Sequence, residues 1–119
     1  MVKIYTGRMW FKGPHKLDIT VKGQHPVGRL FAPTWDIVMG HKRGEITDAE
    51  YTEVYHSLMV KSYREHHQVW DEILNRKYVV FCCYCKADKF CHRFILAGYF
   101  EKLGATYCGE VPSTSKYYR

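Results

Sequence analysis

The chain has 119 residues, 46% of them hydrophobic and 25% charged, which are the proportions of a globular domain with a core of its own. No apolar run approaches the roughly 20 residues of a membrane-spanning helix, and residues 1–5 lack the apolar core of a signal peptide, so we expect a cytoplasmic protein with no membrane partner. The formal charge of +6 is compatible with an anionic small molecule or a nucleic acid as partner, although the basic residues are scattered and form no long tract.

The first third of the chain predicts two strands and an irregular segment. Residues 2–5 and 16–21 alternate apolar and polar side chains, which is typical of strands. Gly7 marks the start of the loop between them. Residues 24–36 contain two prolines and a glycine and should be irregular, and residues 36–39 predict a short helical turn.

The middle of the chain predicts a long helix and then the strongest strand. Thr47 and Glu50 have the spacing of a capping box, in which each side chain bonds the other's main-chain amide. From there to Asn75 the chain has no Gly or Pro and its apolar residues recur at helical spacing, which indicates one helix or two helices bent near residues 60–64. Residues 78–84 are apolar on both faces, which favours a central strand of a parallel sheet.

The last third predicts a helix over residues 92–103, a short strand over 105–108 and a polar C-terminal tail over 112–119. This succession of strands and helices predicts an α/β fold. We expect a small three-layer, Rossmann-like domain over residues 1–111, with a mostly parallel sheet of about four strands.

The loop from Cys85 to Arg93 is the part of the chain richest in reactive side chains. It follows the predicted central strand, and the loops at the carboxyl ends of parallel strands are the usual ligand site of an open α/β sheet. Four of the five cysteines lie within residues 82–91. An odd, clustered set without a secretory signal indicates reduced thiols rather than a disulfide framework.

The cysteines invite comparison with a zinc site. Cys82, Cys85, Cys91 and His92 are residue types that bind zinc in tetrahedral sites. However, successive side chains of a strand point to opposite faces, so Cys82 should lie on one face and Cys83, with Cys85, on the other. We therefore predict no cofactor, keep a zinc site as an alternative, and interpret Cys82 and Cys83 as small core side chains.

Cys91 is the cysteine placed best for catalysis. It stands at the start of a predicted helix beside His92 and Arg93, where the helix end and the cation should lower the pKa of the thiol. We predict Cys91 as a nucleophile or acid and His92 as an acid or base. Arg93 should bind a phosphate or carboxylate through two hydrogen bonds. The Cys-x5-Arg spacing of phosphatase loops is absent.

Charged residues at the same sheet edge complete the predicted site. Asp18 lies within a predicted strand, where a carboxylate needs a partner, and is predicted to orient a catalytic group. The remaining candidates for ligand binding, besides Arg93, are Cys85, Lys86, Lys89, Arg8 and Glu110.

The segments Cys83–Lys86 and Phe90–Arg93, followed by Gly104 and Tyr107–Glu110, resemble an uncharacterised bacterial and phage family, domain of unknown function 488, which has a Cys-His-Arg signature after a central strand. The resemblance implies an α/β fold and a site around Asp18, Cys91, His92 and Arg93, without an established activity. Thr20 stands where that family usually has Arg.

The sequence therefore predicts a protein that binds an anionic ligand, a nucleotide or a nucleic-acid-derived phosphate, at the Cys85–Arg93 loop. Thiol-dependent catalysis at this loop is a further hypothesis. Two alternatives stay open: a non-catalytic phage-type binding or inhibitor protein, and a zinc-stabilised interaction module.

Overall fold

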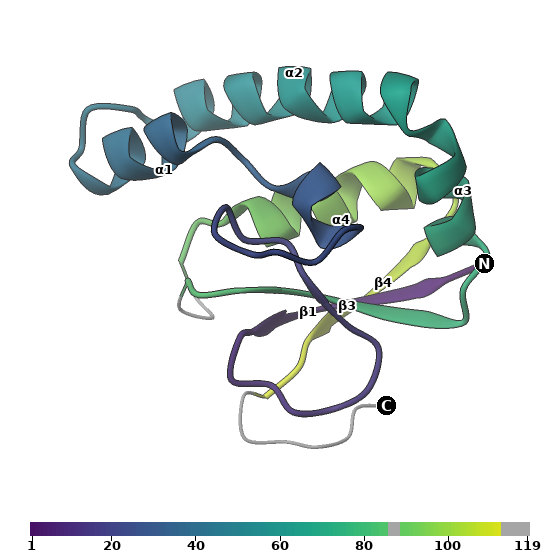
Figure 1. The fold of residues 1–119 in the computed structure, drawn as a ribbon. Helices are drawn as coiled ribbons and strands as arrows, with labels where there is room; N and C mark the ends of the chain where they lie inside the picture. Colours follow the sequence, from purple (N-terminus) through teal and green to yellow (C-terminus); the bar gives the residue numbers. More distant parts are fainter. Residues whose placement is uncertain (86–88, 113–119) are drawn as a thin grey trace.

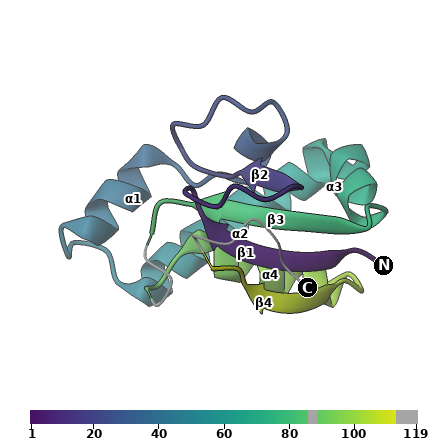
Figure 2. The same ribbon diagram turned by 90° about the horizontal axis from the view of Figure 1, so that it is seen from below.

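A sheet of four parallel strands forms the centre of the computed structural model, which describes residues 1–85 and 89–112 (Figures 1 and 2). The strands are β1 (Lys3–Arg8), β2 (Lys16–Asp18), β3 (Tyr78–Cys83) and β4 (Thr106–Glu110), in the order β2-β3-β1-β4. Every neighbouring pair is parallel. The predicted α/β class and the four-stranded parallel sheet are confirmed.

The helices are stacked on one face of this sheet (Figure 1). They are α1 (Trp35–Lys42), α2 (Asp48–Glu65), α3 (His67–Leu74) and α4 (His92–Lys102), with the short 3-10 helix η1 (Gly28–Phe31) before them. The sheet, α4 and α2 follow one another as layers on that side. The opposite face carries no helix among the described residues; Phe11 and Val111 pack against it.

Aromatic side chains fill the space between the sheet and the helices. Trp70 stacks on Phe100 with ring centroids 4.8 Å apart, and Phe31 contacts Trp70 edge-on at 5.0 Å. The Tyr55 hydroxyl donates a hydrogen bond of 2.7 Å to the main-chain oxygen of Phe31, which fixes η1 against α2. The core therefore holds α2 and the 19–34 segment in one position above the sheet edge.

The long helical pattern forms two helices. Thr47 and Glu50 make both hydrogen bonds of the predicted capping box at the start of α2. The helix ends at Glu65, and His66, with φ −129° and ψ 37°, separates it from α3, slightly beyond the predicted bend. The Trp70 indole donates to the Ser62 hydroxyl at 3.1 Å and bridges the break.

Two strand ends differ from the prediction. β1 continues through Gly7 to Arg8, because a glycine allows a close approach there: a Cβ on Gly7 would lie 2.8 Å from Val111 Cγ2. β2 ends at Asp18, three residues early. Asp18 Oδ1 accepts hydrogen bonds from the Thr20 amide at 2.9 Å and the Thr20 hydroxyl at 2.6 Å, and this local turn competes with the ladder.

The carboxyl ends of the strands meet at one edge, as predicted. Arg8 is opposite Cys83 in the β1–β3 ladder, and Asp18 is opposite Cys82 in the β2–β3 ladder. Most of the predicted C-terminal tail lies outside the described residues. No helix in the described part of the chain is both long and apolar enough to cross a membrane.

Candidate functional site

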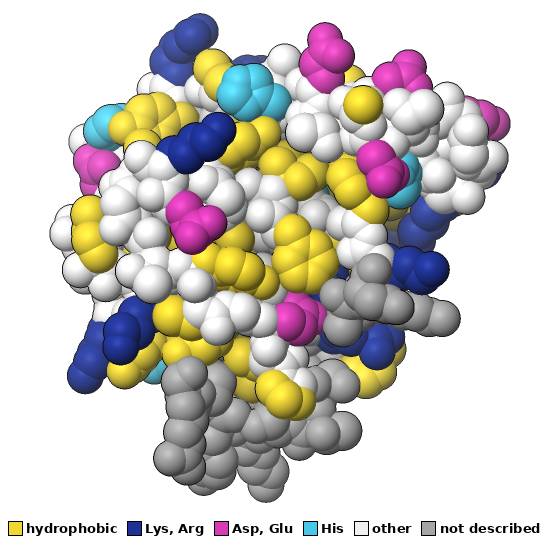
Figure 3. All heavy atoms as spheres, turned by 180° about the vertical axis from the view of Figure 1, so that it is seen from behind, with side chains coloured by type: hydrophobic (Ala, Val, Ile, Leu, Met, Phe, Trp, Pro, Cys, Tyr) yellow, Lys and Arg dark blue, Asp and Glu magenta, His cyan; other side chains and the backbone are white. Residues whose placement is uncertain are grey.

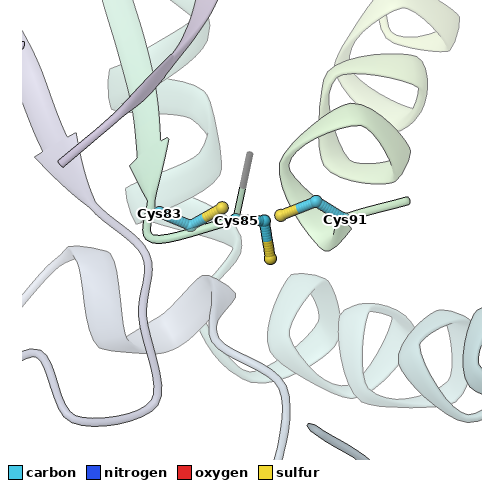
Figure 4. A group of neighbouring side chains, drawn as sticks. All are labelled: Cys83, Cys85 and Cys91. Atoms are coloured by element: carbon cyan, nitrogen blue, oxygen red, sulfur yellow. The ribbon is translucent and has the colours of Figure 1, made fainter. Parts of the chain in front are cut away.

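Three thiols converge at this edge of the sheet. Cys83 ends β3, Cys91 directly precedes α4, and Cys85 lies between them (Figure 4). Their sulfur atoms are all within 4.8 Å of one another. Cys83 and Cys91 are buried, Cys85 is partly exposed, and all three are free thiols. We call these residues the thiol cluster.

The alternation of the strand sorts the cysteines as predicted. Cys82 points to the opposite face and packs with Tyr5 and Phe11, so it is a core side chain and cannot share a metal with the cluster. The interpretation of Cys83 as a core side chain is confirmed as far as its burial is concerned, but it is incomplete. Cys83 is buried, but its sulfur belongs to the cluster and accepts a hydrogen bond of 2.9 Å from Arg93 Nη1.

The electrostatics of the cluster favour a thiolate at Cys85. Hydrogen bonds from Cys83 and Cys91 hold the pKa of the Cys85 thiol well below its ordinary value. Burial, followed by the hydrogen bonds to the other two thiols, raises the pKa of Cys91. The predicted fall of the Cys91 pKa is therefore wrong, because burial outweighs the effect of the helix end.

His92 is buried and contacts the cluster directly. Its Nε2 donates to the main-chain oxygen of Ile19 at 2.7 Å, which assigns the proton to Nε2 and leaves Nδ1 as an acceptor. Nδ1 lies 3.7 Å from Cys91 Sγ. Burial lowers the pKa of His92 to about 4, so the ring is neutral at pH 7. The two neighbours can meet because Cys91 has extended backbone angles, φ −159° and ψ 147°, and is not yet helical.

Arg93 lies behind the cluster, fully buried. Its Nε and Nη2 donate to the two carboxylate oxygens of Glu110 at 3.1 and 2.9 Å. The geometry places Arg93 where it orients Cys83, and not among the residues that line the adjacent pocket. Glu110 reaches this edge as predicted, with Arg93 as its partner.

A pocket of about 490 Å³ opens over the thiol cluster. Its inner end is formed by the cluster and His92, and aromatic side chains line its walls. Two lysines lie on its rim, and the Lys22 ammonium sits 4.8 Å from the centre of the Trp35 ring. None of the described lining residues is acidic. The lining beyond the cluster and His92 includes Thr20, Val21, Lys22, Trp35, Val38, His41, Lys42, Tyr51, Tyr84 and Phe90.

The other predicted charged residues that the structure describes do not line the pocket. Asp18 is engaged by Thr20 as described above, and contacts the loop rather than the cluster. The Arg8 guanidinium lies 5.1 Å from the centre of the Trp10 ring. Lys89 is exposed, and Lys86 lies outside the described residues.

The pocket walls are the part of the site that sequence reasoning missed. Trp35 comes from α1 and Tyr51 from α2, and only the tertiary fold brings them to the loop after β3. No local motif signals this. The sequence does indicate that Cys83 belongs with Cys85, because strand alternation places both side chains on the same face of the sheet.

The positive charge of the chain is not gathered into one broad surface on the face seen in Figure 3. There, basic and acidic side chains are interspersed around hydrophobic ones. Such a mixed surface is typical of an ordinary solvated face, so the described residues of this side form no extended basic track. The lysines on the pocket rim are therefore the better candidates for contact with an anion.

Comparison with known proteins agrees with the resemblance found in the sequence. No curated protein and no solved structure has significant similarity to the chain. A family model described as the active DUF488-N3 subclade matches residues 2–104, which include β1, β2, β3, α4 and the thiol cluster. The chain belongs to the DUF488 family, in the subclade described as active.

Proposed function

We propose that the protein is an enzyme that binds a ring-bearing anion, a nucleotide or a nucleic-acid-derived phosphate, and acts on it at the thiol cluster. One observation carries the proposal: a single pocket joins lysines at its rim, aromatic walls and reactive side chains at its inner end.

The size and walls of the pocket support a ring-bearing ligand. A volume of about 490 Å³ is that of a small-molecule site. Trp35, Tyr51 and Phe90 offer aromatic surface, and Trp35 is 45% exposed, which leaves ring area available for a ligand. A nucleobase is flat and polarisable, and stacking on such rings stabilises binding by about 1–3 kcal/mol.

The charges support an anion. Lys22 and Lys42 are exposed on the rim, and no described lining residue carries a negative carboxylate to oppose them. The phosphate of a ligand whose ring lies between the aromatic walls would contact these ammonium groups, while the rest of the ligand reaches toward the cluster.

The inner end of the pocket supports chemistry beyond binding. Three thiols and the unprotonated Nδ1 of the neutral His92 lie together there, and His92 is held in place by Ile19. An imidazole oriented in this way can accept a proton from a reacting group. The description of the subclade as active agrees with an enzyme.

Calorimetric titration with matched nucleosides and nucleotides tests the proposal. Nucleotides should bind more tightly than their nucleosides, and raising the salt concentration should reduce that difference. The double variant Lys22→Gln/Lys42→Gln should lose roughly tenfold in nucleotide affinity, since each of the two exposed charge pairs contributes up to about 1 kcal/mol and about 1.4 kcal/mol corresponds to tenfold. The control Lys12→Gln/Lys61→Gln removes the same charge from exposed residues outside the pocket and should bind normally.

Three outcomes would overturn the proposal. If no nucleotide or nucleoside binds, or if both double variants weaken binding equally, the pocket is not an anion site. If nucleotides bind but are recovered unchanged, the alternative of a non-catalytic binding protein replaces the enzyme.

A further inference from the structure

We propose that Cys83, Cys85 and Cys91 bind a soft divalent cation of the zinc class as three thiolate ligands, with the fourth coordination position facing the pocket. The inference concerns the same pocket as the proposed function, but it depends only on the cluster, and metal binding can be tested without any other ligand.

The positions of the sulfur atoms are close to those of a metal site. A zinc–sulfur bond of about 2.3 Å in a tetrahedron sets two sulfurs about 3.8 Å apart. The cluster sulfurs lie within 4.8 Å of one another, so a movement of about 1 Å at most would close the site. Cys85 is partly exposed and lies in the loop after β3, where such a movement requires no change in the sheet.

The donor set selects the class of metal. The three ligands are thiols, and no carboxylate belongs to the cluster. Thiolates favour zinc and other soft ions, whereas magnesium and calcium require oxygen ligands. Cys83 ends β3 and Cys91 directly precedes α4, so two of the ligands are held by rigid elements, and Cys85 lies in the loop two residues after Cys83.

The surroundings suit the charge of such a site. Three thiolates and a divalent cation carry a net charge of −1. Arg93 Nη1, fully buried, donates to Cys83 Sγ at 2.9 Å, and Glu110 holds the other side of the guanidinium in place. Hydrogen bonds of this kind orient metal ligands in known sites. The amino end of α4 at Cys91 adds partial positive charge.

The open side of the cluster decides between a structural and a reactive metal. Structural zinc sites have four protein ligands, whereas catalytic ones have three and an open position for water or substrate. Here, the three thiols of the cluster lie with His92 at the inner end of the pocket. A cation held there would face the bound ligand.

Titration of the reduced, metal-free protein with Co²⁺ and Cd²⁺ tests the inference. We expect one equivalent of each to bind, with the sulfur-to-metal charge-transfer bands of thiolate ligation. Replacement of Cys83, Cys85 or Cys91 with Ala should each lower the affinity by more than about 100-fold, since changes to outer-shell partners alone cost 10–100-fold. Cys82→Ala and Cys108→Ala are the matched controls and should bind the metal normally.

Alkylation of the wild-type protein gives a second measurement, which does not depend on whether the cysteine variants fold. With Zn²⁺ bound, the three cluster thiols should be protected from alkylation, and the exposed Cys108 should react at the same rate with and without metal. Absence of a stoichiometric metal, equal losses in the cluster and control variants, or protection that includes Cys108 would each overturn the inference. Nucleotide binding by the metal-free protein would leave the proposed function standing if the metal site fails.

Discussion

Replacing Glu110 with Gln keeps the shape of the side chain but removes its charge from a buried pair. Arg93 is fully buried, and the carboxylate of Glu110 accepts two of its hydrogen bonds, at 3.1 and 2.9 Å. The amide retains one acceptor oxygen and turns an N–H group toward a cation. We expect the free energy of unfolding to fall because the buried guanidinium loses its carboxylate.

The burial of the pair sets the size of this loss. Removing one partner of a fully buried ion pair costs about 3–5 kcal/mol. Glu110 is 21% exposed, so water screens part of the lost interaction, and we expect about 2–3 kcal/mol. For a domain whose total stability is about 5–15 kcal/mol, this is a large fraction.

The chain contains a matched control at its surface. Arg76 donates to both oxygens of Glu72 at 2.6 and 2.8 Å, in the same paired geometry, but the side chains are 33% and 54% exposed. Glu72→Gln should therefore cost less than about 1 kcal/mol. Urea unfolding followed by circular dichroism measures both variants. Equal losses in the two variants would refute the argument that burial gives the Arg93 pair its strength.

Three further predictions concern the stability of the fold around the site. Gly28→Ala should destabilise the fold by more than about 2 kcal/mol, because its Cβ would lie 1.8 Å from the main-chain oxygen of Asp18. Gly98→Ala, with no atom within 4 Å of the added Cβ, should stabilise α4 by about 0.5–1 kcal/mol, and thermal unfolding of both variants checks this. Thr47→Ala should cost about 1 kcal/mol in urea unfolding through loss of the α2 cap, and an unchanged midpoint would contradict it. The pKa of Glu50 is lowered by its hydrogen bonds to Thr47, so the carboxylate's share of the cap should be lost as the pH falls through that pKa, and Glu50→Gln should lack this pH dependence.

Local patterns predicted the parts of the fold that depend on neighbouring residues. The capping box at Thr47 depends on residues three apart, and the strand before Cys85 and the helix after Cys91 follow from runs of apolar residues. The rule that strands of a parallel sheet end at one edge then placed the loop between them correctly.

The pairing of Arg93 with Glu110 could not be derived from such patterns. It depends on the register of β4, which shifts between Ile4 and Tyr5 in the neighbouring strand β1, and on Gly109, whose φ of 112° is rare for other residues. Both residues were expected at the sheet edge, yet as separate ligand-binding groups. A register shift of one residue moves a side chain to the other face, so the partner of Arg93 is fixed only in three dimensions.

Cys82 and Cys83 show how the sheet separates packing from chemistry. The two thiols are adjacent and both buried, but Cys82 lies among the apolar side chains of the sheet face opposite the helices, where burial raises its pKa to about 12. Cys83 faces the helices and meets a cation and two further thiols. A buried ion pair such as Arg93–Glu110 is often no more stabilising than apolar side chains of the same volume, so packing alone does not explain why the edge beneath the pocket is polar. The contrast between the two faces of β3 favours a functional role for the thiol cluster.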